Sequence, residues 1–340
     1  MGLCPFKVLI VASGEQKTPA RKGRIQSMKK KFAIVFPGQG SQSVGMLGDL
    51  AEAFPAVTDT FAQASDALGL DLWKLSQTGP LEALNDTRNT QPVLLTASIA
   101  VMRVLHDSGL PAATVMAGHS LGEYSALVAA NVLVLEDALR LVAKRGEFMQ
   151  AAVPPGVGAM AAILGLDDDA VRDACIDGAG DEVVEAVNFN APGQVVIAGH
   201  AAAVSRTAEL AKQAGAKRAL MLDVSVPSHC VLMKPAADRL AELIAETAFA
   251  MPDVPVLHNV TVAEATSPEE LGQLLLEQLS KPVRWVETIR AMSDRGVDLV
   301  IEAGPGKVLT GLNKRIDKML KTLPVFNPAS LETAMETVNA

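Results

Sequence analysis

A serine between two glycines is the first candidate for chemistry in this chain. Residues 118–122 read Gly-His-Ser-Leu-Gly, a G-x-S-x-G pattern with Ser120 at its centre. The pattern alone is weak, but an expected buried strand, Ala113–Ala117, precedes it, and a helix-forming stretch, Leu121–Ala130, follows it. A strand that turns sharply into a helix is the nucleophile elbow, which exposes a serine hydroxyl at the carboxyl end of the strand. We therefore predict that Ser120 is a nucleophile; the alternative is that it only caps the following helix.

A serine nucleophile needs a base, and the chain has five histidines. His119 adjoins Ser120, so we expect its side chain to point away into the sheet and to be structural. His229, in the sequence VSVPSHC, follows an expected strand and a proline that stiffens the loop. His258 lies near the end of another expected strand and remains open as the alternative base. A paired serine and histidine can transfer an acyl group in two steps through an acyl-serine ester.

Two glycine-rich loops resemble nucleotide-binding motifs without completing them. The loop at 38–42 would need glycine at position 43 to be a dinucleotide fingerprint, and Ser43 stands there. The sequence GPGK at 304–307 lacks the span of a Walker A loop and the Ser or Thr that should follow the lysine. Neither loop is predicted to be a nucleotide phosphate site.

The composition indicates an ordinary globular protein with a large core. Of the 340 residues, 49% are hydrophobic and 20% charged, and the formal net charge of −8 argues against nucleic acid as a partner. No apolar stretch reaches the roughly 18 residues that a membrane span needs, so we expect no membrane association. Three cysteines, Cys4, Cys175 and Cys230, fit neither a disulfide framework nor a metal site, and they indicate the reducing cytoplasm.

The first 27 residues differ from the rest. Residues 1–27 contain five basic residues and one acidic residue, and they have no amphipathic period. We expect this segment to be a disordered basic extension; a transit peptide is the alternative.

The order of the expected elements predicts two domains. Strands and helices alternate from Lys31–Phe36 to Glu136–Ala151, which is typical of an α/β fold with a largely parallel sheet. From Gly158 the order becomes β-α-β-β-α-β, that of a ferredoxin-like unit. We predict a large domain of residues 28–152 and 226–340, with a small domain, 153–225, inserted in it. Later elements are expected as a strand over Lys217–Val224, helices over Lys234–Thr247, Pro268–Leu279 and Pro282–Asp294, and strands over Val254–Asn259 and Leu299–Ala303.

Six motifs occur in one order along the chain and carry a resemblance to a known family. They are FPGQGSQ (36–42), GHSLGEY (118–124), KRGEFMQ (144–150), NFNAPGQVVIAGH (188–200), VPSHCVLMKPAAD (226–238) and EAGPGKVLTGL (302–312). Together they resemble the malonyl-CoA:acyl-carrier-protein transacylases of bacterial type II fatty acid synthesis, from about Met28 to Ile316. The resemblance implies an α/β-hydrolase-like parallel-sheet domain with an inserted ferredoxin-like domain, the same layout as above.

The resemblance also implies a role for individual residues. The planar fork of an arginine suits a carboxylate because it makes two parallel charge-assisted hydrogen bonds; without the resemblance, Arg145 could equally be a surface charge. The implied roles are Ser120 as nucleophile, His229 as base, the backbone N–H groups of Gln39 and Leu121 as oxyanion hole, Arg145 as the ligand of the malonyl carboxylate, the Gln278 carbonyl as the acceptor that orients the histidine, and Met149, Asn190 and Ser228 in the substrate pocket.

The activity that the resemblance implies is reversible transfer of malonyl from malonyl-CoA to the 4'-phosphopantetheine thiol of acyl carrier protein. It implies no metal and no permanently bound cofactor, and we expect a monomer. Since the carrier protein and this chain are both acidic, docking would need a local basic patch. Candidates for the patch are Lys212, Lys217, Arg218, Lys314 and Arg315.

The alternatives to this activity are a serine hydrolase, a non-catalytic carrier-binding module and a domain of a larger synthase. Because the chain stops soon after residues 302–312, we expect a discrete enzyme.

Overall fold

A computed structural model describes Met1 and residues 30–224 and 226–340 of the chain. Apart from Met1, the predicted extension, residues 1–27, lies outside the described residues, and so does Cys4. None of the helices in the described part combines the length and the hydrophobicity that crossing a bilayer requires.

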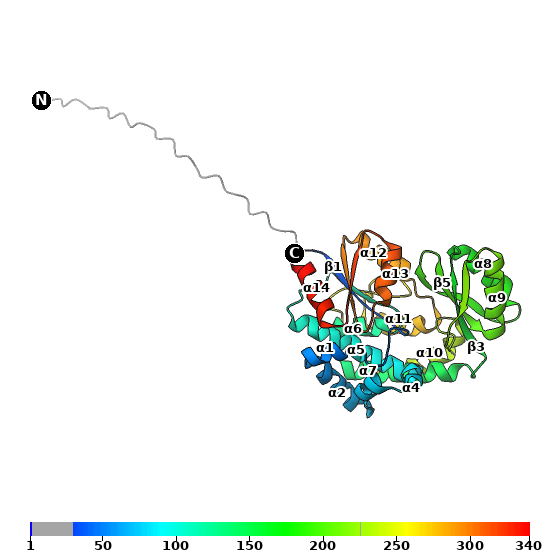
Figure 1. Cartoon of the computed structure of the whole chain (residues 1–340), viewed down its shortest axis with the longest axis horizontal. Helices are drawn as coiled ribbons and strands as arrows, with labels where there is room; N and C mark the ends of the chain where they lie inside the picture. Colours follow the sequence, from blue (N-terminus) through cyan, green and yellow to red (C-terminus); the bar gives the residue numbers. More distant parts are fainter. Residues whose placement is uncertain (2–29, 225) are drawn as a thin grey trace.

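The larger of two sheets has five strands, all paired in parallel, in the order β7-β2-β1-β8-β9. Figure 1 labels its central strand, β1. The central strand is buried along its whole length, as expected of a strand with helices on both faces of its sheet. Alternate residues of this strand enter two different apolar clusters, Phe32 and Ile34 on one face and Ala33 and Val35 on the other. The strands are β1 (Phe32–Phe36), β2 (Val115–Gly118), β7 (Val256–Leu257), β8 (Leu299–Ala303) and β9 (Lys321–Val325).

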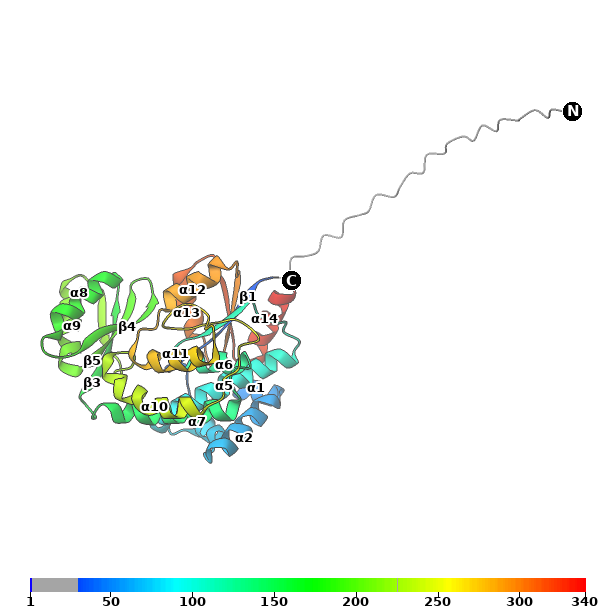
Figure 2. The same cartoon turned by 180° about the vertical axis from the view of Figure 1, so that it is seen from behind.

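Helices cover both faces of this sheet. Residues of α12 and α13 belong to the cluster on one face, and residues of α5, α6 and α7 to the cluster on the other. Figure 2 shows the same arrangement from behind. The helices around the large sheet are α1 (Gly48–Ala53), α2 (Ala56–Leu68), α3 (Leu72–Thr78), α4 (Leu81–Asn85), α5 (Thr87–Asp107), α6 (Gly122–Ala129), α7 (Leu135–Ala152), the 3-10 turn η1 (Val231–Met233), α10 (Lys234–Glu246), α11 (Pro268–Ser280), α12 (Trp285–Asp294), α13 (Val308–Ile316) and α14 (Pro328–Asn339).

The smaller sheet is antiparallel, in the order β4-β5-β3-β6, and lies beside the larger one in both views. Its elements follow one another as β-α-β-β-α-β, the ferredoxin-like order. The fold class predicted from the sequence is therefore confirmed. The elements are β3 (Gly158–Leu164), α8 (Asp168–Ala179), β4 (Val184–Ala191), β5 (Gln194–His200), α9 (Ala201–Gln213) and β6 (Arg218–Met221).

Several predicted boundaries were wrong, and one strand was missed. The predicted strand over Val254–Asn259 covers only Val256–Leu257, and the one over Lys217–Val224 covers only Arg218–Met221. The predicted helix at 282–294 starts at Trp285, because Val283 bridges to Asn188 of β4 instead. Strand β9 was not predicted, and it contains Pro324, which has no N–H to donate. An edge strand tolerates a proline because the N–H groups on its outer side pair with no other strand. Helices α3, α4, α13 and α14 were also not predicted.

The parallel sheet determines where the loops of interest meet. Ligands of such sheets bind at the carboxyl ends of the strands. β1 and β2 end side by side, since Phe36 pairs with Gly118, and β7 runs next to β2. The loops that follow these strands therefore bring Gln39, Ser120 and residues 258–259 to one edge of the sheet.

Candidate active site

Ser120 occupies a tight turn between β2 and α6. Its φ of 52° is in the left-handed region, a conformation that costs a residue other than glycine on the order of 1–3 kcal/mol. The two neighbouring glycines are required by space: a Cβ on Gly118 would lie 1.8 Å from the backbone of Gly122, and one on Gly122 would lie 2.1 Å from the carbonyl oxygen of Phe36. Strand, turn and helix can approach this closely only because both glycines lack a side chain.

The structure brings Ser120 and His229 together, although 109 residues separate them in the chain. The distance from Ser120 Oγ to His229 Nε2 is 2.7 Å. On the other side of the ring, Nδ1 lies 2.7 Å from the carbonyl oxygen of Gln278. A carbonyl oxygen can only accept, so Nδ1 carries the proton and Nε2 presents its lone pair to the serine hydroxyl.

His229 is buried as a neutral imidazole. Its side chain is enclosed, at 2% exposure. Burial first, and then the positive charge of Arg145, lowers the pKa of the His229 imidazole to about 3. The ring can therefore accept a proton from Ser120 across the whole physiological pH range.

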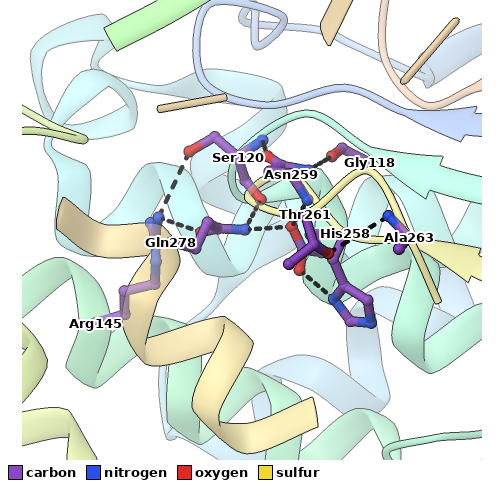
Figure 3. A network of polar contacts seen from close by, with 9 residues as sticks. Gly118, Ser120, Arg145, His258, Asn259, Thr261, Ala263 and Gln278 are labelled. Atoms are coloured by element: carbon purple, nitrogen blue, oxygen red, sulfur yellow. Dashed lines mark hydrogen bonds and ion pairs between the residues drawn. The ribbon is translucent and has the colours of Figure 1, made fainter. Parts of the chain in front are cut away.

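Arg145, on α7, is fully buried next to Ser120. Its Nη1 donates to the side-chain oxygen of Gln91 and its Nη2 to that of Gln278, each at 2.9 Å. Nη2 also lies 3.5 Å from Ser120 Oγ, and Figure 3 shows the guanidinium reaching toward that atom. Arg145 Nε is buried without a hydrogen-bond partner among the described residues. Burial lowers the pKa of Arg145, and because its closest partners are neutral amides, the cation can attract an anion beside Ser120.

A cavity of about 130 Å³ opens at this serine. Its wall includes Ser120, His229 and Gln39 from the loops at the sheet edge, and Met160 and Asn188 from strands of the smaller sheet. A larger cavity of about 820 Å³ elsewhere, lined by α5 and the chain around residues 128–137, contains none of these residues. We therefore locate the candidate site by its chemistry and not by cavity size.

Two backbone N–H groups near Ser120 are available to a ligand. In residues 30–224 and 226–340, neither the N–H of Gln39 nor that of Leu121 donates a hydrogen bond. The loop of Gln39 touches the turn, since a Cβ on Gly38 would lie 2.5 Å from the carbonyl oxygen of His119. The N–H of Ser120 itself donates to Asn259 Oδ1 at 2.7 Å and is not available.

Comparisons with known proteins agree with this geometry. The family model for the acyl transferase domain matches residues 33–323. The malonyl CoA-acyl carrier protein transacylase of Escherichia coli strain K12 is 56% identical over 306 residues, 90% of this chain and 99% of the relative. The chain belongs to the malonyl-CoA:acyl-carrier-protein transacylase family. The family suggested by the six sequence motifs is thereby confirmed.

Solved structures of this transacylase family resemble the chain along nearly its whole length. The acyl carrier protein S-malonyltransferase of Vibrio cholerae has a TM-score of 0.88 and 58% identity, over 90% of this chain and all of that one. A malonyl-transacylase solved in complex with its type II polyketide acyl-carrier protein has a TM-score of 0.90 and 55% identity, over 91% of this chain and 100% of that one.

The three further positions matched to transacylase motifs lie in different places. Ser228 is part of the cavity wall, whereas Met149 and Asn190 are not among its lining residues. Met149 is buried, with its sulfur 3.5 Å from Gln91 Nε2. Asn190, on β4, accepts a hydrogen bond of 2.7 Å from His119 Nε2. His119 therefore joins the turn to the smaller sheet, and burial lowers its pKa.

Sequence reasoning missed three residues of this site. Gln91, on α5, holds Arg145; Glu123, in the first turn of α6, is fully buried; and Asn259 contacts both sides of the turn at Ser120. The available signals were local: Glu123 lies three residues after Ser120 in the motif GHSLGEY, and Asn259 follows a strand that ends at the same edge. Within the described residues, no group of three or more His, Cys, Asp or Glu side chains could hold a metal ion.

Proposed function

We propose that this chain transfers the malonyl group of malonyl-CoA to the phosphopantetheine thiol of acyl carrier protein and so supplies extender units for fatty acid synthesis. One observation carries the proposal: a serine hydroxyl lies 2.7 Å from a neutral imidazole and 3.5 Å from a buried guanidinium. A nucleophile, a base and a carboxylate ligand on one centre are what a malonyl-serine intermediate needs.

In the first half-reaction, Ser120 Oγ attacks the thioester carbonyl while His229 Nε2 takes the hydroxyl proton. The negative charge on the carbonyl oxygen is stabilised by the N–H groups of Gln39 and Leu121, which have no other partner in the described part of the chain. When the tetrahedral intermediate collapses, the C–S bond breaks, His229 returns its proton to the departing thiolate, and CoA leaves as the free thiol.

In the second half-reaction, the phosphopantetheine thiol of the carrier takes the place of CoA. His229 removes the thiol proton, the sulfur attacks the malonyl ester, and the C–O bond to Ser120 breaks as the proton returns to Oγ. The Gln278 carbonyl holds Nδ1 in both halves, which keeps Nε2 as the reacting nitrogen. A thioester is consumed and a thioester is formed, so the transfer is reversible.

Arg145 confers the preference for an acyl group that ends in a carboxylate. The malonyl carboxylate is only two bonds from the carbonyl carbon that Ser120 attacks, and Arg145 Nη2 is beside that serine. An acetyl group would leave the buried guanidinium without its anion, a desolvated charge that the enzyme must carry uncompensated. Gln91 binds both Arg145 and Met149. Ser228 and His119 line the pocket, and Asn190 contributes to it through its hydrogen bond with His119.

For the domain division, we propose residues 28–152 and 226–340 as the large domain and 153–225 as the small one. The membership of the sheets supports it: β3 to β6 all lie within 158–221, and every strand of the parallel sheet lies outside that range.

The cytoplasm is the compartment we propose. The buried free thiols of Cys175 and Cys230 support it, and burial raises the pKa of each thiol to about 12.

The carrier protein docks, in this proposal, on exposed basic side chains near the end of the smaller sheet. The Arg315 guanidinium donates a hydrogen bond to the side chain of Gln194, at the start of β5. The side chain of Lys217 packs on Gly165, whose N–H bonds to Gly193, the neighbour of Gln194. Two of the candidate segments thus lie near each other. The candidates are Lys212, Lys217, Arg218, Lys314 and Arg315.

Mass spectrometry of the acylated protein tests the proposed function. Incubation with malonyl-CoA should add one malonyl group, which peptide mapping finds on Ser120, and acetyl-CoA should add much less. Ser120→Ala should abolish the adduct. Ser125→Ala is the control, because Ser125 is a nearby serine that is fully buried in α6, the helix that follows the turn, and the variant should acylate like the wild type. An unmodified wild type, or release of free malonate without transfer to added carrier protein, would refute the proposal.

A further inference from the structure

The turn that carries Ser120 is clamped by a side chain from another loop. Asn259, directly after β7, accepts the Ser120 N–H on its Oδ1 at 2.7 Å and donates from its Nδ2 to the Gly118 carbonyl at 2.6 Å. Figure 3 shows the amide of Asn259 between these two residues. One side chain therefore satisfies a donor and an acceptor that the sharp turn removes from the regular hydrogen bonding of strand and helix.

The clamp is itself held in place by a buried carboxylate. The backbone N–H of Asn259 donates to Glu123 Oε2 at 3.0 Å, and His258 Nδ1 lies 2.7 Å from Glu123 Oε1. Glu123 and Asn259 are fully buried. Glu123 belongs to α6, the helix that begins at the turn. The contacts therefore form a closed ring: the turn continues into α6, Glu123 of α6 binds Asn259 in the loop after β7, and Asn259 binds the turn at Ser120.

Gln278 binds the carbonyl side of Ser120, but its replacement would not test the turn alone. Its Nε2 donates to the Ser120 carbonyl at 3.0 Å and to Glu123 Oε2 at 2.8 Å. The same residue also contacts Arg145 and His229, so its replacement would disturb several groups at once. In the described part of the chain Asn259 has no hydrogen bond to Arg145 or His229, and its replacement changes the clamp alone.

From this ring of contacts we infer that Asn259 is a positioning residue, which holds the Ser120 hydroxyl and the adjacent Leu121 N–H in the geometry that acylation needs. It does not touch the reacting atoms; it acts through the backbone on either side of Ser120. Without the amide, the Ser120 N–H and the Gly118 carbonyl would both be unpaired, and the turn would relax from its positive φ. The inference rests on the proposed function.

The test compares acylation rates of Asn259→Ala and wild type in rapid-quench experiments with malonyl-CoA. We expect the acylation rate constant to fall about 100-fold, as displacements on the order of 1 Å do in catalytic sites, while the KM for malonyl-CoA changes less than threefold. The matched control is Asn313→Ala: Asn313 is equally buried and binds Trp285 Nε1 through its Oδ1 at 2.9 Å, far along the chain from the turn. That variant should lose thermal stability and keep the wild-type rate constant.

A second variant gives a signature that simple destabilisation would not. In Asn259→Asp, an ionised carboxyl would repel the Gly118 carbonyl, whereas a protonated one can donate to it and still accept from Ser120, as the amide does. The ratio of variant to wild-type rate constants should therefore rise as the pH falls from 8 to 5. The titratable and charged side chains around this loop, Glu123, His258 and Arg284, are present in both proteins, so the ratio reports the carboxyl introduced at position 259.

The outcomes separate this inference from the proposed function. If the wild type does not acylate on Ser120, the proposed function itself is wrong. If it does and Asn259→Ala acylates at the wild-type rate, or the ratio for Asn259→Asp does not change with pH, the positioning role is overturned. A loss in Asn259→Ala that Asn313→Ala reproduces would also overturn it.

Discussion

Two buried histidines of this chain, His229 and His258, lie in similar settings and differ in one respect. Each is at most 2% exposed, and each has an oxygen 2.7 Å from Nδ1. For His229 that oxygen is a neutral backbone carbonyl; for His258 it is the carboxylate of Glu123. Nε2 of His229 meets the Ser120 hydroxyl, whereas Nε2 of His258 is buried without a partner among the described residues.

In the mechanism that we propose, the direction of the ring, and not its burial, separates the base His229 from the structural His258. His229 lies on the wall of the cavity, where its free lone pair faces a hydroxyl that can react. The Nδ1 of His258 meets the buried Glu123, which also binds Asn259 and Gln278. The imidazole of His258 thus supports the scaffold of the site.

Replacing each histidine in turn is the strongest test of the difference between His229 and His258. His229→Ala should lower the rate of Ser120 acylation about 1,000-fold, the usual size of a general-base contribution. His258→Ala should lower it less than tenfold, but should cost about 1–3 kcal/mol of unfolding free energy because the Glu123 carboxylate loses a donor. Rapid-quench acylation and denaturant unfolding measure the two effects. Equal rate losses in the two variants would show that the distinction is wrong.

Arg145→Ala should have the next largest effect. It removes the positive charge that lies near His229. Malonyl transfer should lose about 3 kcal/mol of transition-state binding, a factor of about 100, whereas acetyl transfer is spared. Since the positive charge of Arg145 also lowers the pKa of His229, acetyl transfer by the variant should decline at a higher pH than in the wild type. Steady-state kinetics with both acyl groups give the result. Equal losses for malonyl and acetyl would remove Arg145 as the carboxylate ligand.

The smallest expected effect is a flat pH profile. Burial and Arg145 lower the pKa of His229 to about 3, so kcat/KM of the wild type should change less than about twofold between pH 8 and 5. Malonyl-pantetheine is the suitable substrate, because it lacks phosphates that titrate near pH 6. An inflection near pH 6.5 would contradict the lowered pKa.

The same pKa shift predicts how His229 affects stability. The unfolded chain takes up this proton near pH 6.5 and the folded chain only near pH 3. The contribution of His229 is therefore fully present above pH 6.5 and is lost as the pH falls toward 3. Melting temperatures of the wild type should decline over this range more than those of a folded His229→Gln variant.

Much of the fold could be predicted because its signals are local. Apolar runs marked β1, β2 and β8, and the change to β-α-β-β-α-β order marked the second sheet. Strand β9 was missed because Pro324 is a breaker everywhere except at an edge, and whether a strand lies at an edge depends on the assembled sheet. Residues 258 and 259 were expected in a strand, although they form the loop that supports Ser120.

The site could be predicted in part. The turn at Ser120 follows from two glycines between a strand and a helix, but the six motifs and their resemblance, not periodicity, selected His229 over His258. The local signals of Glu123 and Asn259 were too weak to select them, since an acid in the first turn of a helix and an asparagine after a strand are common.

By itself, the sequence determined most of the order of strands and helices and the tight turn that exposes Ser120, because those depend on residues a few positions apart. Only the tertiary structure decided which imidazole faces that hydroxyl, where Glu123 is buried and what holds the turn in place. Those contacts span 109 to 158 residues of the chain. They exist only where packing has already brought the loops of two sheets to one edge, and no local pattern of residues encodes that.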